Sequence, residues 1–160
     1  YPTTFVAMAL TPEKLVDVES IRQLKARYFR LMDQKRWDEW RDVFVEGVEI
    51  TTPDDTGDPN PIVGRDLFID RLIAMIATVP TIHHGHMSEI SVDGDTAAGV
   101  WSMEDHLFWP PAFGLGHMWG TGWYEDTYRR SEDGQWRIAT TYLRRIRVEA
   151  NGAQIFPRES

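Results

Sequence analysis

The chain contains 160 residues and no cysteine, and its formal net charge at pH 7 is -8. A single domain of this length can bury a sizeable hydrophobic core, so no second domain is expected. An acidic chain without a basic tract argues against nucleic acid or an anionic membrane surface as a partner. The absence of cysteine excludes disulfides and thiolate metal sites, and it is typical of a cytoplasmic protein.

Residues 1–10 are expected to be an N-terminal extension or a cloning remnant, followed by one domain over 11–160. This first segment is mildly apolar, but it lacks the basic start and the full hydrophobic stretch of a secretory signal. Met8 is a candidate native start. The sequence contains no apolar run of the length that a membrane-spanning helix requires.

Three helices are predicted in the first half of the chain. Thr11 can cap a helix that starts with Pro12, because a hydroxyl can accept a free backbone N–H and proline is favoured at the first helical position. Apolar residues then keep helical spacing to about Asp33. Apolar stripes also predict a short second helix over 37–44 and a third helix over 67–77.

One short strand, at 48–52, and two irregular connections are also predicted. The connection 53–64 is rich in proline, glycine and aspartate, which disfavour regular structure, so a surface loop is expected. The connection 109–119 carries aromatic side chains between glycines and prolines, and we expect it to form the rim of a ligand pocket.

Two Asp-Gly dipeptides, Asp93-Gly94 and Asp133-Gly134, each separate a pair of strand-like runs and predict two hairpins. The four strands are expected to form one strongly curved antiparallel sheet. Their ranges are 82–92, 96–108, 119–130 and 135–149. Helices followed by a curved sheet indicate an α+β fold with the helices packed on the concave face.

Two charged residues occupy positions where the strand pattern is apolar. Strict alternation along the last strand places Arg144 on the same face as Trp136 and Val148, with Arg145 on the other face. Asp105 likewise lies on the bulkier apolar face of its own strand. An interior charge is costly unless it is paired, so we expect Asp105 and Arg144 to form an ion pair in a polar pocket inside the sheet.

Three histidines lie close together in one predicted strand. Alternation sends His83 to one face and His84 and His86 to the other, unless Gly85 bulges the strand. No HExxH motif is present, so a histidine that acts as acid or base is favoured over a metal site, and no metal or cofactor is expected. A carboxylate would orient such a histidine, and Asp33 is a candidate for this role.

Other polar residues have simpler interpretations. Tyr28 lies on the apolar stripe of the first helix and by itself indicates a core tyrosine. The macrodipole disfavours the acid Asp33 at a helix end, so a turn residue and a functional residue both remain open. Glu104 and His106 share the outer strand face and would meet solvent or another subunit. Nucleophilic and phosphate-binding motifs are missing from the sequence.

Four segments together resemble the SnoaL-like branch of the nuclear transport factor 2-like superfamily. They are 21–40, His83-His-Gly-His86, Trp101-Ser-Met-Glu-Asp105 and Tyr142-Leu-Arg144. Within this branch the chain most resembles bile-acid 7α-dehydratases, with scytalone dehydratase and hexachlorocyclohexane dehydrochlorinase as more distant likenesses. The resemblance implies a cone of three helices that closes a curved sheet around a deep pocket. It also implies a homo-oligomer, either a dimer or a trimer, formed through the outer sheet face.

The resemblance to bile-acid dehydratases also implies an active site and assigns it to five residues. These are Tyr28, Asp33, His83, Asp105 and Arg144. The dehydrochlorinase likeness includes only Asp33 and His83, which there form a proton-abstracting dyad.

These observations predict a cofactor-independent lyase that eliminates water or another β-leaving group from a hydrophobic cyclic substrate, similar to a steroid or polyphenol. Six aromatic residues are expected to line the pocket and its rim. They are Trp101, Phe108, Trp109, Phe113, Trp119 and Trp123. An isomerase of the ketosteroid type or a polyketide cyclase is an alternative. A non-catalytic ligand-binding protein or the small subunit of a ring dioxygenase is another.

Overall fold

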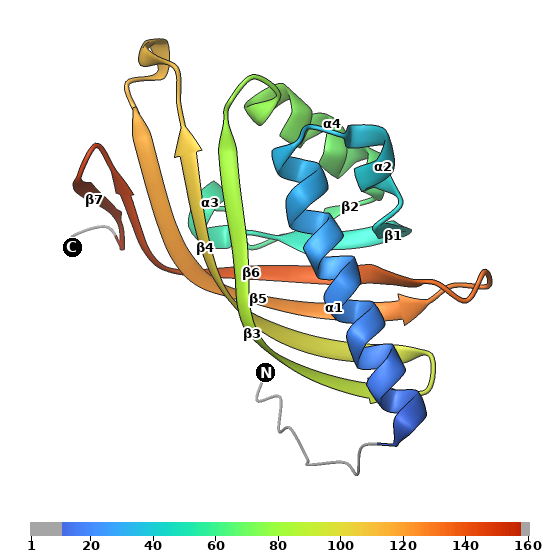
Figure 1. Ribbon diagram of the computed structural model, residues 1–160. Coiled ribbons are helices and arrows are strands. Elements are labelled where there is room, and N and C mark those ends of the chain that lie inside the picture. Colours follow the sequence, from blue (N-terminus) through green and yellow to red (C-terminus); the bar gives the residue numbers. More distant parts are fainter. Residues whose placement is uncertain (1–10, 158–160) are drawn as a thin grey trace.

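A curved sheet with helices on its concave face forms the protein (Figure 1), in a computed structural model that describes residues 11–157. The expectations for residues 1–10 lie outside the described residues. The helices are α1 (Pro12–Asp33), α2 (Trp37–Arg41), α3 (Pro53–Thr56) and α4 (Arg65–Ile76), with a 3-10 turn, η1 (Pro111–Phe113). The strands are β1 (Phe44–Thr51), β2 (Ile62–Val63), β3 (Thr81–Asp93), β4 (Thr96–Phe108), β5 (His117–Arg130), β6 (Trp136–Ala150) and β7 (Ala153–Phe156).

The sheet has the strand order β2-β1-β6-β5-β4-β3, and β7 pairs with β6. The four long strands pair antiparallel, so both predicted hairpins are confirmed. The expected α+β fold with a curved sheet is confirmed, and the shorter β1 extends this sheet by pairing with β6 in parallel, which makes the sheet mixed. The chain reaches β6 only after α4 and three long strands, and this connection allows the parallel pairing.

The segment expected as a surface loop, 53–64, contains regular structure. Pro53 opens the single turn of α3, and Gly57 ends it with a φ of 73°. Proline at the first position and glycine after the last are the usual boundaries of a helix. The two-residue strand β2 follows and pairs with β1. The prediction of a loop was wrong because short elements leave little periodicity in a sequence.

The last hairpin was not predicted either. Asn151 and Gly152 connect β6 to β7, and both have a positive φ, 52° and 77°. This dipeptide is a strong signal for a two-residue hairpin turn, so the sequence did contain the information. The hairpin carries Ile155 and Phe156 to the edge of the cavity described below.

Helix α1 lies across the concave face, beside β3 (Figure 1). Thr11 caps the helix as expected by accepting a hydrogen bond from the backbone N–H of Lys14, at 3.4 Å. The Phe29 ring packs directly on the backbone of β3 at Gly85, where an added Cβ would lie 2.4 Å from the ring. Gly85 therefore permits close packing and does not bulge the strand. The irregularity of β3 falls after His86.

Two bulges in β6 change which residues face inward. Ala139 and Ile146 have no partner in the register with β5, so the alternation shifts by one residue at each of them. After the first bulge the inward residues are Thr141, Leu143 and Arg145, which are buried or nearly so. The prediction that Arg144 points inward is wrong for this reason.

None of the helices within residues 11–157 is long and apolar enough to cross a membrane.

The second bulge of β6, at Ile146, explains the need for glycine at position 122 of β5. A Cβ at Gly122 would lie 2.0 Å from the backbone oxygen of Arg144. We expect Gly122→Ala to destabilise the fold by about 3 kcal/mol, the upper part of the range for overpacking. Gly47→Ala in β1 is the matched control, since a Cβ there meets nothing within 4 Å. Urea unfolding measures both, and equal stabilities would contradict the bulged geometry.

Candidate active site

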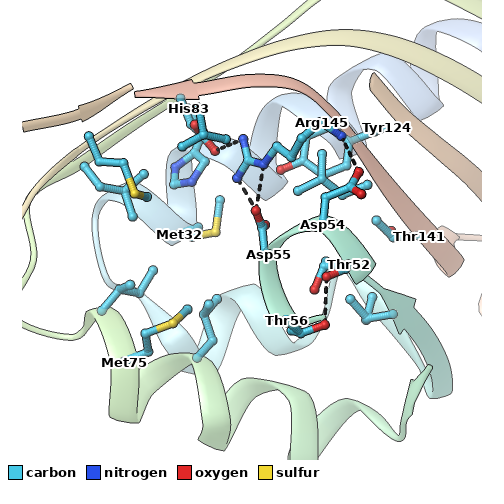
Figure 2. A pocket seen from close by; sticks show the side chains of 18 of the residues that line it. Met32, Thr52, Asp54, Asp55, Thr56, Met75, His83, Tyr124, Thr141 and Arg145 are labelled. Carbon is cyan, nitrogen blue, oxygen red and sulfur yellow. Dashed lines mark hydrogen bonds and ion pairs between the residues drawn. The ribbon is translucent and has the colours of Figure 1, made fainter. Parts of the chain in front are cut away.

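A cavity of about 490 Å³ lies between the concave face of the sheet and helices α1, α3 and α4 (Figure 2). Most of its wall is apolar, and the apolar residues include Met32, Ile50, Leu72, Leu107, Met118 and Leu143. Its polar wall includes Tyr28, His83, Asp105, Tyr124 and Arg145. A volume of this size falls within the usual range for small-molecule sites, about 300–1,000 Å³.

The end of α1 and the start of β3 bring Asp33 and His83 together. Asp33 Oδ1 lies 2.6 Å from His83 Nδ1, and Asp33 Oδ2 accepts a hydrogen bond from the His83 backbone N–H at 2.9 Å. The His83 side chain is 8% exposed and lines the cavity, whereas Asp33 lies behind it. The expected contact between this carboxylate and this imidazole is therefore present.

Additional donors explain how an acid can occupy the end of a helix. The Thr81 hydroxyl donates a hydrogen bond to Asp33 Oδ1 at 2.8 Å, and the Lys35 ammonium donates one to the Thr81 hydroxyl at 2.9 Å. Partial burial lowers the pKa of Lys35, and the negative charge of Asp33 opposes this shift. Hydrogen bonds from His83 and Thr81 thus offset the unfavourable interaction between the Asp33 carboxylate and the helix macrodipole.

Asp105 forms a buried ion pair with Arg145, not with Arg144. The distance from Arg145 Nη1 to Asp105 Oδ2 is 2.8 Å, and the side chains are 6% and 3% exposed. Arg145 also donates to Asp55 of α3, at 2.9 and 3.2 Å, as Figure 2 shows. Burial by itself would lower the pKa of Arg145, but Asp105 and Asp55 outweigh it and raise that pKa above its ordinary value.

Arg144 lies on the outer face and is a correction to the predicted site. Its side chain is 47% exposed and donates to Glu125 at 2.6 Å. The bulge at Ala139 shifts the alternation of β6 by one residue and gives the inward position to the neighbouring Arg145. The active-site role expected for Arg144 therefore becomes a role proposed for Arg145.

Glycine at position 120 makes room for the ion pair. A Cβ at Gly120 would lie 2.5 Å from Asp105 Oδ1 and 2.6 Å from Arg145 Nη1. Asp105 also pairs directly with His83 across β3 and β4. The two inward residues are therefore neighbours on the sheet.

Tyr28 projects from α1 into the cavity wall and is 5% exposed. Its ring packs against Trp40, Phe44 and Tyr124. Burial, with the added effect of the charge of Asp126, raises its pKa well above the ordinary value of 10.0. Tyr28 is therefore a stable phenol that can donate a hydrogen bond.

A second buried ion pair was not predicted. Lys25 and Asp126 are fully buried, with 2.7 Å between Nζ and Oδ2. The hydroxyls of Tyr128 and Thr141 also donate to Asp126, at 2.8 and 3.0 Å. Both charges interrupt apolar patterns, since Lys25 lies between Leu24 and Tyr28 on one helix face. The argument that identified Asp105 would have found them too.

The expected aromatic pocket is largely absent. Of the six aromatic residues named for it, only Trp109 lines the cavity. Trp101 is buried in the core, and Phe108, Phe113 and Trp123 are exposed. Trp119 contacts Glu104 on the outer face. Strand alternation sends Phe108, Trp119 and Trp123 to the outer face, whereas Trp101 packs on the inner face near Gly85, outside the cavity wall. Aliphatic and methionine side chains therefore dominate the cavity wall.

The mixed curved sheet and the cavity on its concave face define an α+β domain of the nuclear transport factor 2-like type. The sequence profile of the SnoaL-like domain matches residues 13–142, and the chain belongs to this family.

Several solved structures share the fold. The Kfla4162 protein of Kribbella flavida has a TM-score of 0.79 and 23% identity over 86% of this chain and 95% of its own. A candidate scytalone dehydratase of Novosphingobium aromaticivorans has a TM-score of 0.73 and 22% identity over 94% and 100%. Hexachlorocyclohexane dehydrochlorinase LinA-type3 of Novosphingobium barchaimii has a TM-score of 0.74 and 15% identity over 91% and 98%.

The two neighbouring arginines of β6 provide a matched test of the ion pair. Arg145→Met removes the partner of a buried carboxylate, and we expect a loss of about 3–5 kcal/mol in the free energy of unfolding. Arg144→Met removes an exposed pair, for which a loss of about 0–1 kcal/mol is expected. Chemical denaturation measures both losses. Equal losses would show that Arg145 is not the buried partner.

Burial raises the pKa values of Tyr28, Tyr124 and Tyr128, three of the five tyrosines. Their contribution to stability is fully present below the ordinary pKa of 10.0 and is lost as pH rises from there toward the raised values. We expect the phenolate absorbance of these three to appear only as alkali unfolds the protein. A joint spectroscopic titration and circular dichroism scan measures this, and ionisation of all five before unfolding would contradict it.

Proposed function

We propose that this protein is a cofactor-independent lyase that eliminates water, or another β-leaving group, from a hydrophobic cyclic substrate. The contact between Asp33 and His83, 2.6 Å long and at the wall of an apolar cavity, carries the proposal. A carboxylate-oriented imidazole is a general base whose ordinary pKa lies near neutral pH. The position of His83 at the cavity wall gives its imidazole access to a small molecule.

Asp33 determines which nitrogen of His83 acts as the base. Because Asp33 accepts the hydrogen bond at Nδ1, the neutral imidazole carries its proton there and has a lone pair at Nε2. Nε2 takes a proton from the carbon next to an activating carbonyl. Asp33 then stabilises the imidazolium that forms.

The electron pair of the broken C–H bond and the proton held by His83 are both used in the rest of the elimination. The C–H electron pair first forms an enolate, then the C=C bond as the β-hydroxyl departs. That hydroxyl takes the proton from the His83 imidazolium, so the products are an unsaturated ketone and water. Tyr28 donates a hydrogen bond to the enolate oxygen. Its raised pKa favours this role over transfer of its own proton.

Two unsatisfied polar atoms support a substrate that carries both a donor and an acceptor. Within residues 11–157, the buried side-chain atoms without a hydrogen-bond partner are Asp105 Oδ1 and Trp109 Nε1. Both residues line the cavity. A buried unpaired polar atom is costly, so a substrate hydroxyl on Asp105 and a substrate oxygen on Trp109 would each remove a penalty. Arg145 holds Asp105 in place for this contact.

The structural neighbours support elimination as the reaction class. One is described as a candidate scytalone dehydratase and another as a dehydrochlorinase, and both names denote loss of a small group from a cyclic molecule. Identities of 22% and 15% concern the fold, so the reaction proposed here depends on the dyad and the cavity. A steroid or a polyphenol-like ketone is the proposed substrate, because most of the cavity wall is apolar.

The test compares variants of the dyad on a panel of cyclic β-hydroxy ketones that includes hydroxylated steroids and polyphenols. We expect His83→Ala to abolish turnover and Asp33→Asn to lower it by roughly 10²–10⁴-fold, because general-base catalysis contributes this much. His117→Ala, which removes an exposed histidine of β5, is the control and should keep full activity. Mass spectrometry and proton NMR in deuterated water measure product formation and exchange.

Each result has a distinct meaning. A product lighter by one water confirms elimination, whereas a product that loses no group and gains deuterium on carbon would indicate an isomerase. Binding of these ketones without turnover or exchange would indicate a carrier. Turnover that survives His83→Ala would remove His83 from the mechanism.

A further inference from the structure

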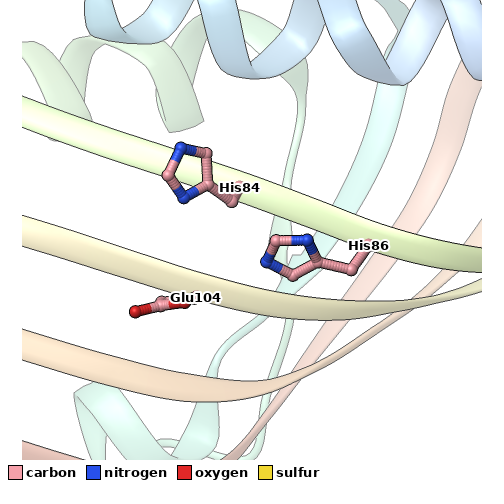
Figure 3. A group of neighbouring side chains, drawn as sticks. All are labelled: His84, His86 and Glu104. Atoms are coloured by element: carbon pink, nitrogen blue, oxygen red, sulfur yellow. The ribbon is translucent and has the colours of Figure 1, made fainter.

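The outer face of the sheet carries a second group of histidines, opposite the cavity. His84 and His86 are both exposed and project from β3, and Glu104 projects from β4 beside them (Figure 3). The alternation that turns His83 inward turns these two residues outward. The three side chains take no part in the proposed elimination.

The strand register brings the three side chains together. His84 pairs directly with Glu104 across β3 and β4, and His86 lies two residues further along β3 on the same face. One ligand atom from each of the three residues lies within 4.8 Å of the others. The His84 and His86 ring centroids are 5.8 Å apart.

We propose that His84, His86 and Glu104 bind a divalent transition-metal ion of the zinc class. Imidazole nitrogen and carboxylate oxygen are preferred ligands of such ions. Zinc bonds of about 2.0–2.1 Å place tetrahedral ligand atoms about 3.4 Å apart. The exposed imidazoles can reach this spacing by rotation about their side-chain bonds. Three protein ligands leave the fourth position to water.

Neighbouring side chains orient the carboxylate. Trp119 Nε1 donates to Glu104 Oε1 at 2.7 Å, and His106 Nε2 lies 3.1 Å from the same oxygen. These contacts direct Oε1 toward β5 and leave Oε2 for the metal. Such supporting hydrogen bonds typically strengthen metal binding about 10–100-fold.

A competing pair of histidines lies nearby on the same face. His106 Nδ1 and His117 Nε2 are 2.9 Å apart, and their rings are stacked. This distance is that of a direct hydrogen bond, which leaves no space for an ion between the two nitrogens. The proposed site therefore uses the histidines of β3, and His117 supplies a matched control.

The experiment titrates Co²⁺ into tag-free protein and records the visible absorption of tetrahedral cobalt, with Zn²⁺ competition to obtain affinities. We expect one ion per chain. His84→Ala and His86→Ala should each weaken binding by more than about 100-fold, the upper value for loss of a supporting contact. Glu104→Gln should weaken it as well, whereas His117→Ala should bind cobalt as the unchanged protein does. Circular dichroism of the metal-free variants checks the fold.

Other results would overturn the proposal. Failure of the unchanged protein to bind Co²⁺ and Zn²⁺ is one of them. Binding that persists in both His84→Ala and His86→Ala is another, and so is an equal loss in His117→Ala, which would place the ion at the competing pair. These measurements need no substrate, so they are independent of the proposed lyase activity.

Discussion

The cost of removing charge from water governs the interior of this protein. Three charged or polar couples lie on or beneath the concave face, and each one has its partner in direct contact. They are Asp33 with His83, Asp105 with Arg145, and Lys25 with Asp126. An isolated charge in such a place costs several kcal/mol, so each carboxylate requires a partner from another element. The first and third couples connect α1 to the sheet, and Arg145 also pairs with Asp55 and so connects α3 to β6.

Local irregularity is what makes the pairing of Asp105 possible. The bulge at Ala139 shifts the alternation of β6 so that Arg145 faces Asp105, and Gly120 leaves room for both side chains. Gly122 permits the close approach of the bulged backbone. The site therefore depends on residues that never touch a substrate. A larger residue at Gly120 or Gly122 would disturb the ion pair by steric crowding.

The sequence predicted the elements whose periodicity is long and regular. The helix to Asp33 and the two hairpins at Asp-Gly dipeptides follow from local spacing. Two positions 50 residues apart share no local pattern, so local spacing could not show that Asp33 and His83 meet. The resemblance to the SnoaL-like family indicated this contact. The identity of the inward arginine could not be predicted, because one inserted residue reverses the faces of a strand and leaves the hydrophobic pattern ambiguous. Lys25 and Asp126 were predictable from their apolar surroundings.

A single strand carries the histidines of both proposed sites. Because β3 stays regular through Gly85, His83 enters the dry cavity while His84 and His86 remain in water. In the cavity the imidazole is held by Asp33 in one tautomer, as a base requires. On the outer face the imidazoles are free to turn and lie beside an anchored carboxylate, as a metal ligand set requires. Histidine is therefore proposed for two different roles, and the difference comes from the side of the sheet on which each side chain lies.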